Sequence, residues 1–236
     1  MDDALLGLLV LVGRPASGKS EIIDYLQRLD PGERRRRFGM GELQVIDDFP
    51  LLWAWFEEDA ILERMGLPRL HTTPDGHFNG VHLWDVLIHR LCLAYDKLAA
   101  GDVGQLARTT AIVEFSRGSE HGGYRRALAA LSPAVLARAS VLYVRVSFEE
   151  SLRKNRRRFN PARPHSILEH ALSDEKLALL YGSDDWDELP RDGAGRLVVG
   201  DHRLPVAVFE NEDDVTTPRG DALGDRLEAC LRSLSR

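Results

Sequence analysis

The sequence has few cysteines, no excess of positive charge and no apolar run long enough to cross a membrane. Its two cysteines, Cys92 and Cys230, lie inside apolar helical patterns without the spacing of a metal site. The 31 basic and 37 acidic residues give a net charge of -6, which argues against a general nucleic-acid or membrane-surface binder. The apolar segment at 4–12 follows two aspartates and is too short to span a bilayer. We therefore expect reduced cysteines, a cytoplasmic location, and neither a membrane nor a nucleic-acid partner.

Internal repeats, low-complexity tracts and breaks in composition are also missing. A chain of 236 residues without them suits one α/β domain with insertions. We expect a single domain over residues 1–236, with a helical insertion on the substrate side at about 50–100 and a lid at about 153–190.

What the sequence does have is a glycine-rich signature after an apolar run. Residues 5–12 are apolar, as expected of a central parallel strand covered on both faces, and residues 13–20 read G-R-P-A-S-G-K-S. Apolar residues then recur at helical spacing from Ile22 to Leu29. This is the P-loop pattern, in which backbone N–H groups wrap phosphate oxygens. A glycine turn without a ligand is the alternative.

Each residue type in this loop has a physical role. Gly13 and Gly18 permit backbone conformations that a Cβ atom would block, and a helix opening near Lys19 aims free N–H groups at an anion. As a catalytic group, Lys19 is expected to reach the β- and γ-phosphates, while the Ser20 hydroxyl ligates Mg²⁺. The expected cofactors are therefore ATP and Mg²⁺, and the expected nucleotide contacts in the loop are Gly13, Arg14, Pro15, Ala16, Ser17, Gly18, Lys19 and Ser20.

Two aspartates follow the second expected strand, at 43–46. Ligands bind at the carboxyl ends of parallel strands, so Asp47 and Asp48 are expected in the substrate site. Either carboxylate can serve as the general base that accepts a proton from an attacking hydroxyl. The alternative is a pair of turn or capping residues, with Asp48 as N-cap of a helix at 51–65.

The segment between two expected helices, at 51–65 and 83–98, is poor in apolar residues. Such a loop over the sheet edge is a place for a substrate lid, and His77 within it is a candidate substrate contact. Lone histidines of this kind are more often surface residues.

The third expected strand, at 109–113, ends in an acid. An apolar strand followed by Glu114 has the Walker B form, in which the carboxylate holds Mg²⁺ directly or through water. Arg117, three residues further on, is within reach of an anionic substrate group, and a structural salt bridge is the alternative.

A basic helix follows the fourth expected strand, at 140–146. Arg153, Arg156 and Arg157 lie at i, i+3 and i+4, so one helix face presents three guanidinium groups. We expect this face to clamp the triphosphate, with Arg156 as a catalytic group and Arg153 and Arg157 as nucleotide contacts. A solvated basic helix is the alternative.

Two short strands are expected near the end of the chain, at 196–199 and 206–209. They form either a hairpin or an edge strand followed by the fifth parallel strand. Asn211 closes the second of them, where an adenine ring would lie, and is a candidate nucleotide contact.

Together these motifs resemble the P-loop small-molecule kinases, above all the uridine kinase and nicotinamide riboside kinase group, and more loosely the nucleoside monophosphate kinases. The resemblance covers most of the chain and rests on residues 13–20, 47–49, 77–87, 112–114 and 148–158. It implies that Asp47 acts on the substrate hydroxyl, that Glu114 lies near magnesium, and that the arginines at 153–157 belong to the lid. Ser151 stands where related kinases often carry an arginine that packs on adenine.

The resemblance also implies a three-layer α/β/α P-loop NTPase fold with helical lid insertions. Its parallel five-stranded sheet is expected in the order 2-3-1-4-5. The expected reaction moves the γ-phosphoryl group of ATP to a hydroxyl of a small metabolite, nucleoside-like or vitamin-like. The alternatives are a nucleoside monophosphate kinase-like enzyme, a nucleotide-hydrolysing switch that acts on a protein partner, and a nucleotide-binding module without chemistry. The sequence predicts no oligomeric state.

Overall fold

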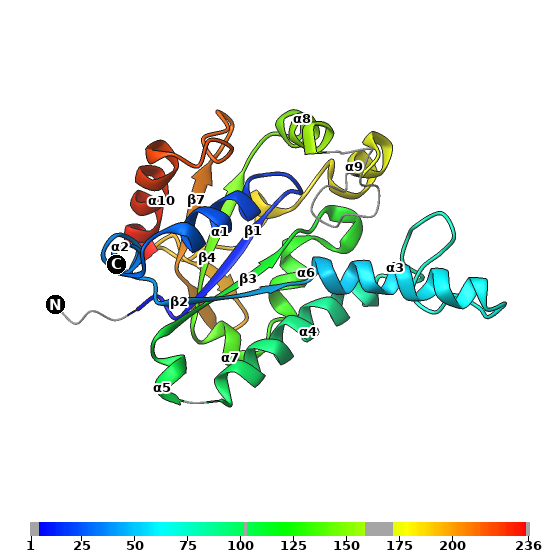
Figure 1. Cartoon of the computed structure of the whole chain (residues 1–236), viewed down its shortest axis with the longest axis horizontal. Helices are drawn as coiled ribbons and strands as arrows, with labels where there is room; N and C mark the ends of the chain where they lie inside the picture. Colours follow the sequence, from blue (N-terminus) through cyan, green and yellow to red (C-terminus); the bar gives the residue numbers. More distant parts are fainter. Residues whose placement is uncertain (1–4, 102, 159–171, 235–236) are drawn as a thin grey trace.

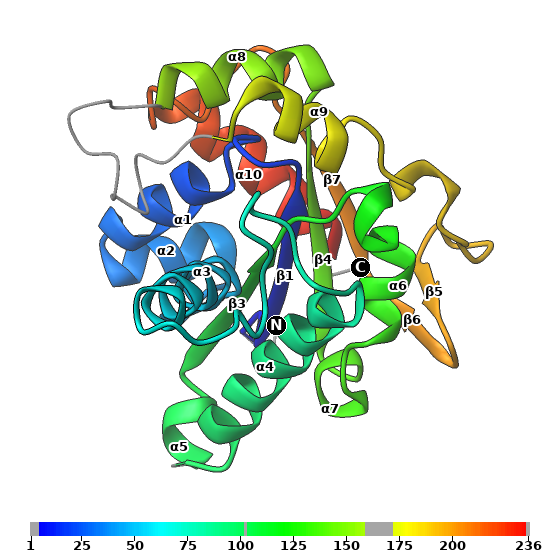
Figure 2. The same ribbon diagram turned by 90° about the vertical axis from the view of Figure 1, so that its right-hand side faces the viewer.

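The computed structural model describes residues 5–101, 103–158 and 172–234. The expected lid at about 153–190 therefore lies partly outside the described residues. A central parallel sheet is flanked by helices on both faces, as Figure 1 and, turned by 90°, Figure 2 show. Its strands are β1 (Leu8–Gly13), β2 (Glu42–Asp47), β3 (Thr109–Phe115), β4 (Ala139–Arg145) and β7 (Val206–Glu210).

The helices and the remaining strands connect these five strands. In chain order the helices are α1 (Lys19–Arg28), α2 (Pro31–Phe38), α3 (Phe49–Arg64), α4 (His82–Ala99), α5 (Val103–Leu106), the 3-10 turn η1 (Ser119–His121), α6 (Gly123–Ala129), α7 (Pro133–Leu136), α8 (Phe148–Arg158), α9 (Asp174–Tyr181), the 3-10 turn η2 (Trp186–Glu188) and α10 (Asp221–Leu234). Two short strands, β5 (Leu197–Val199) and β6 (His202–Leu204), form a separate antiparallel hairpin.

The strand order is β2-β3-β1-β4-β7, with each neighbouring pair parallel. The expected order 2-3-1-4-5 holds for its first four places. The fifth place belongs to the seventh strand in the chain, because the β5–β6 hairpin is inserted before it. The prediction of the final strands is correct only for β7, the fifth strand of the main sheet; residues 197–199 pair with β6, a strand that the sequence did not predict, in a hairpin outside that sheet.

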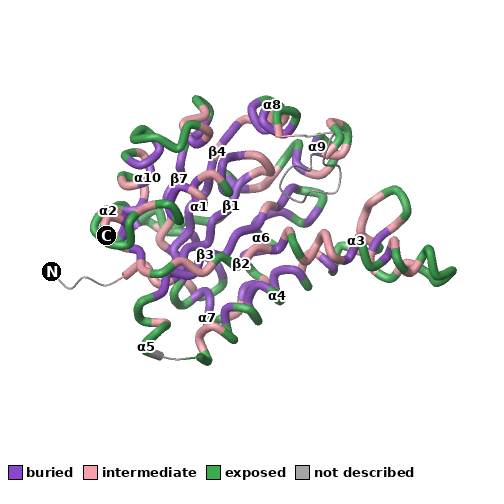
Figure 3. Tube along the Cα trace, viewed as in Figure 1, coloured by how far each residue is buried: buried purple, intermediate pink, exposed green. Residues whose placement is uncertain are grey.

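Side chains of β1 point alternately to the two faces of the sheet and pack into two separate hydrophobic cores. Leu8, Val10 and Val12 pack with α4, α6 and α7, whereas Leu9 and Leu11 pack with α1, α2 and α10. All six residues of β1 are buried, as is usual for a parallel strand covered on both faces. The purple tube in the centre of Figure 3 marks this buried layer. The expected three-layer arrangement is observed.

The arginine-rich run at 34–37 lies in helix α2. The Asp30 carboxylate caps this helix by accepting from the N–H groups of Gly32 and Glu33. Arg34 is buried and donates to the carbonyl oxygens of Leu26 and Gly41. The run therefore includes a packing residue as well as solvated ones.

The insertion between β2 and β3 consists of α3, a loop and α4. Figure 1 shows α3 projecting away from the sheet. Asp59, fully buried on α3, accepts hydrogen bonds from the N–H groups of Leu70, His71 and Thr72 and from the Thr72 hydroxyl. Burial alone would raise the pKa of Asp59, but these hydrogen bonds lower it to about 2. One ionised carboxylate thus fixes the loop to the helix. None of the described helices is long and apolar enough to cross a membrane.

Candidate active site

The loop between β1 and α1 has the backbone geometry that its glycines predict. Gly13 and Gly18 have positive φ angles of 158° and 112°. A Cβ atom on Gly13 would lie 2.5 Å from the Val144 carbonyl oxygen, and one on Gly18 would lie 2.6 Å from Thr216 Oγ1. Helix α1 begins at Lys19, so its free N–H groups point towards the loop. The loop can bind an anion with its backbone.

Lys19 is held inside this loop by three acceptors. Its ammonium group donates to the carbonyl oxygens of Gly13 (3.1 Å) and Arg14 (2.9 Å) and to Ser116 Oγ (2.8 Å). It also lies 3.9 Å from a Glu114 carboxylate oxygen. Burial lowers the pKa of Lys19, although the neighbouring carboxylates oppose that shift. Ser116 is a contact that the motif search missed.

Two acids lie side by side at the carboxyl ends of β2 and β3. Asp47 and Glu114 are directly paired in the register of these strands. Burial, with Asp48 adding negative charge, raises the pKa of Asp47 to about 6. Burial also raises the pKa of Glu114 to about 7, with Lys19 opposing and Asp47 reinforcing the shift. Such raised values are typical of functional carboxylates.

Asp48 has a different environment from Asp47. Its carboxylate accepts a 2.7 Å hydrogen bond from Arg117 Nη1, and both side chains are buried. Asp48 occupies the N-cap position of α3, as the alternative expected, but its side chain makes no capping hydrogen bond there. Asp47 Oδ1 instead accepts from the N–H of Phe49 at 3.0 Å.

Arg117 is fully engaged by the protein. Besides Asp48, it donates to the carbonyl oxygens of Ser116 (2.7 Å) and Trp84 (3.3 Å). Its guanidinium carbon lies 5.0 Å from the centre of the Trp84 ring. These contacts favour the structural alternative for Arg117 over a direct contact with an anionic substrate group.

The oxygen donors at the strand ends fit a magnesium site. Ser20 lines the same cavity as Glu114 and Asp47, and all three present oxygen ligands of the kind that Mg²⁺ prefers. Among the described residues, no group of three His, Cys, Asp or Glu side chains forms a complete metal site. Mg²⁺ needs no such group, because it commonly binds one or two protein oxygens together with substrate phosphates.

The three arginines of α8 that were expected to clamp the triphosphate form ion pairs with the protein. Arg153 contacts Glu150 and Asp214, and Arg156 contacts Asp174. Arg157 contacts Asp214 and also lines the cavity. The three guanidinium groups therefore contact two different segments, one at Asp214 and one at Asp174.

Arg158, which the pattern at 153–157 did not include, lies on the cavity side of α8. It lines the cavity, and its positive charge acts on Lys19, Asp47 and Glu114. Arg156 is not among the residues that line this cavity. Of the α8 arginines, Arg158 is thus the better candidate for a catalytic group. The sequence could have indicated this role, because Arg158 lies four positions after Lys154 and therefore shares its helix face, and both residues line the cavity.

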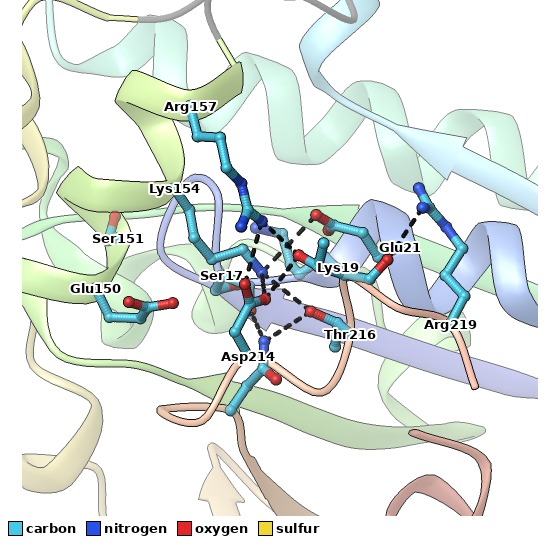
Figure 4. A network of polar contacts seen from close by, with 12 residues as sticks. Ser17, Lys19, Glu21, Glu150, Ser151, Lys154, Arg157, Asp214, Thr216 and Arg219 are labelled. Carbon is cyan, nitrogen blue, oxygen red and sulfur yellow. Dashed lines mark hydrogen bonds and ion pairs between the residues drawn. The ribbon is translucent and has the colours of Figure 1, made fainter. Parts of the chain in front are cut away.

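A polar network connects α8 to the phosphate loop (Figure 4). Lys154, buried on α8, donates to Asp214 (2.7 Å) and to Thr216 Oγ1 (3.0 Å). Asn211 Nδ2 donates to the same hydroxyl oxygen (2.9 Å) and to the Ser17 carbonyl oxygen (2.7 Å). Fully buried Asn211 therefore fixes the loop's backbone, and it is not among the residues that line the cavity.

The side chains of the phosphate loop divide between the ligand side and the support side. Arg14 points away from the cavity, donating to the carbonyl oxygens of Tyr181 and Val146 and pairing with Asp184 at 3.0 Å. The Pro15 carbonyl oxygen accepts a 2.8 Å hydrogen bond from Ser151 Oγ. Ser151, at the place where related kinases often carry an arginine, thus connects α8 to the phosphate loop. Pro15, Ala16, Gly18, Lys19 and Ser20 line the cavity.

One cavity of about 1150 Å³ connects the phosphate loop with the insertion. His77 lines it, as expected of a substrate contact, and lies 3.7 Å from Asp75. Large apolar side chains, which the sequence motifs did not reveal as site residues, also line it: Phe49, Leu52, Trp53, Phe56, Phe78 and Trp84.

Comparisons with known proteins add structural likenesses only. No protein-family model and no curated protein matches the chain. An unliganded sugar kinase from a Janibacter species is 14% identical over 95% of this chain and 94% of that one, with a TM-score of 0.42. A shikimate kinase from Acinetobacter baumannii, in complex with shikimate, is 14% identical over 73% and 74% of the two chains, with a TM-score of 0.33. A Thermus thermophilus protein is 17% identical over 97% and 95%, with a TM-score of 0.40. The function is therefore inferred from the geometry of the site.

Proposed function

We propose that the chain is a phosphotransferase that moves the γ-phosphoryl group of ATP to a hydroxyl of a small molecule. One observation carries this proposal. The same cavity is lined by the phosphate loop, by Asp47, a half-buried carboxylate with a raised pKa, and by side chains of the insertion such as Phe56 and His77. A pure hydrolase needs no second compartment for an acceptor, whereas a kinase does.

The residues divide the work of the reaction between binding and proton transfer. The loop's N–H groups and Lys19 hold the phosphates and stabilise the charge that develops on them. Arg158 approaches the same centre from α8. Asp47 accepts the proton of the attacking hydroxyl, because its carboxylate has no arginine partner comparable to that of Asp48. Much of the catalysis then comes from positioning.

Ser20 and Glu114 are the residues that would hold Mg²⁺. When bound there, the ion neutralises negative charge on the phosphate oxygens. Glu114 accommodates a cation readily, since burial and neighbouring acids raise its pKa to about 7. A positive ion beside it favours the ionised form.

The charges around the acceptor end favour a hydroxyl over a phosphate as the accepting group. A phosphate acceptor calls for free cationic groups. Arg117 is already neutralised by Asp48 at 2.7 Å. The acceptor itself is therefore expected to carry an uncharged hydroxyl.

The test is a coupled assay of ADP formation with the full-length protein, Mg²⁺ and ATP, with and without a panel of hydroxyl compounds. We expect a large rise in turnover with a small acceptor, and a phosphorylated product detectable by mass spectrometry. A rise only with added protein would identify a switch instead. Binding of ATP without turnover under every condition would reduce the chain to a nucleotide-binding module.

A further inference from the structure

We infer that Ser116 is a phosphate-binding residue, whose hydroxyl contacts the γ-phosphate and lets the site distinguish ATP from ADP. This inference rests on the proposed function and adds a residue to it. Ser116 directly follows β3 and lines the cavity together with Glu114. In the register of the sheet, Val12 of β1 pairs with Phe115 of β3. Ser116 therefore lies at the edge of the sheet where the phosphate loop begins.

Lys19 connects Ser116 to the phosphate loop. An ammonium group has three N–H donors. Those of Lys19 donate to two carbonyl oxygens of the loop and, at 2.8 Å, to Ser116 Oγ. A carboxylate oxygen of Glu114 is 3.9 Å away, which is too far for a hydrogen bond. The ammonium group is therefore held by the loop on one side and by the Ser116 hydroxyl on the other.

The hydroxyl proton of Ser116 is available for a ligand. A hydroxyl group can accept and donate at the same time. Among the residues that the structure describes, Ser116 Oγ has no hydrogen-bond partner other than Lys19. Accepting a hydrogen bond from an ammonium group polarises the hydroxyl, which makes it a stronger donor. Such a donor, half-buried in the cavity wall beside a buried positive charge, suits an anionic oxygen.

The place of Ser116 favours contact with the γ-phosphate. During transfer, the γ-phosphoryl group lies between the nucleotide in the loop and the attacking hydroxyl, next to the proposed base Asp47. Asp47 is paired in register with Glu114, two residues before Ser116. The Ser116 hydroxyl is thus on the side of Lys19 that faces these acids. The loop's N–H groups, on the other side, would hold the β-phosphate.

The Asp48–Arg117 ion pair holds the backbone of Ser116 in place. Arg117 Nη1 donates to the Ser116 carbonyl oxygen and to the Asp48 carboxylate, both at 2.7 Å. The guanidinium carbon of Arg117 also lies 5.4 Å from the centre of the Phe115 ring. A donor that acts on developing charge must be fixed before the reaction. The buried ion pair supplies this fixed position, so Arg117 is a positioning residue for Ser116.

The test compares ATP and ADP binding to Ser116→Ala, measured by calorimetry with the full-length protein and Mg²⁺. The variant loses a hydrogen bond to a charged group, so we expect the Kd for ATP to rise about tenfold and that for ADP to stay within about twofold. Ser116→Thr keeps the hydroxyl and should bind ATP within about threefold of the original affinity. Ser119→Ala, at an exposed position on η1 outside the cavity lining, is the matched control.

The outcomes separate this inference from the proposed function. Equal losses of ATP and ADP affinity in Ser116→Ala, or unchanged affinity for both, would overturn the inference alone, because ATP binding needs no acceptor. Failure of the original chain to bind ATP would overturn both. In the ADP assay, Ser116→Ala should lower kcat about tenfold and leave the acceptor KM unchanged. A raised acceptor KM with an unchanged kcat would instead assign Ser116 to the acceptor and contradict the inference.

Discussion

Two adjacent aspartates offer a sharp test, because the structure gives them opposite roles. Asp47 lies beside Glu114 and accepts a hydrogen bond from the N–H of Phe49, whereas Asp48 forms a buried ion pair with Arg117. Asp47→Asn and Asp48→Asn are the same change in chemistry and size, one residue apart. We expect the first to remove activity and the second to remove stability.

The expected loss for Asp48→Asn follows from the burial of Arg117, which is 2% exposed. Removing one partner of a buried ion pair leaves a charge without compensation and costs about 3–5 kcal/mol. Asparagine keeps an oxygen acceptor, so the lower end, about 3 kcal/mol, applies. For a chain of this size, each kcal/mol shifts Tm by about 2–4 °C, which predicts a fall of about 6–12 °C.

The expected loss for Asp47→Asn is kinetic. A positioned general base contributes about 10²- to 10⁴-fold to the rate, so kcat should fall by that factor. The free energy of unfolding should stay constant or rise, since the half-buried carboxylate at this position has a pKa raised to about 6 and is costly to ionise. The amide oxygen can still accept from the N–H of Phe49.

Urea unfolding and the ADP assay measure the two effects on the same protein samples. Binding of ATP, measured by calorimetry, should stay close to that of the unchanged chain in Asp47→Asn. The double change of Asp48 to Leu and Arg117 to Met should recover much of the lost stability, because it removes the unpaired charge. The reasoning fails if Asp48→Asn loses activity at full stability while Asp47→Asn keeps its activity.

Three further results are expected. The rate of transfer should fall about tenfold per pH unit below about 6, because Asp47 with a pKa of about 6 accepts a proton only when ionised, and a flat pH profile would contradict this. Arg158→Ala should lower kcat about 10²-fold and Arg156→Ala less than threefold, measured at saturating ATP; equal effects would refute the choice between them. Asn211→Ala should weaken ATP binding about tenfold in calorimetry, since the loop loses a buried hydrogen bond, and unchanged affinity would speak against its supporting role.

Local patterns predicted the fold well because each strand carries its own signal. The apolar run at 5–12 and the glycine signature after it gave β1 and the phosphate loop. The sheet order followed from the resemblance and holds for four of its five places. The hairpin at 197–204 was ambiguous, because short apolar strands look alike whether they pair within a sheet or beside it.

The site was harder to predict, because its partners are distant in the sequence. Nothing near Asp48 indicates Arg117, which lies 69 positions away and neutralises it. The i, i+3, i+4 spacing of Arg153, Arg156 and Arg157 correctly gave one helix face. It did not reveal that Asp214 and Asp174 pair with these arginines, or that Arg158 lines the cavity and acts on the charge of Asp47. Helix periodicity identifies a face, but only tertiary structure identifies what the face meets.

The neighbouring positions of Asp47 and Glu114 have an evolutionary consequence. Two acids in register, Glu114 buried and Asp47 half-buried, repel each other, and exchanging either for a neutral residue would relieve this repulsion in the native state. If selection acted on folding stability alone, substitutions that replace one of the two acids would therefore tend to accumulate. Proteins that keep both acids accept a lower folding stability in return for catalytic activity. This is the pattern expected where activity is under selection.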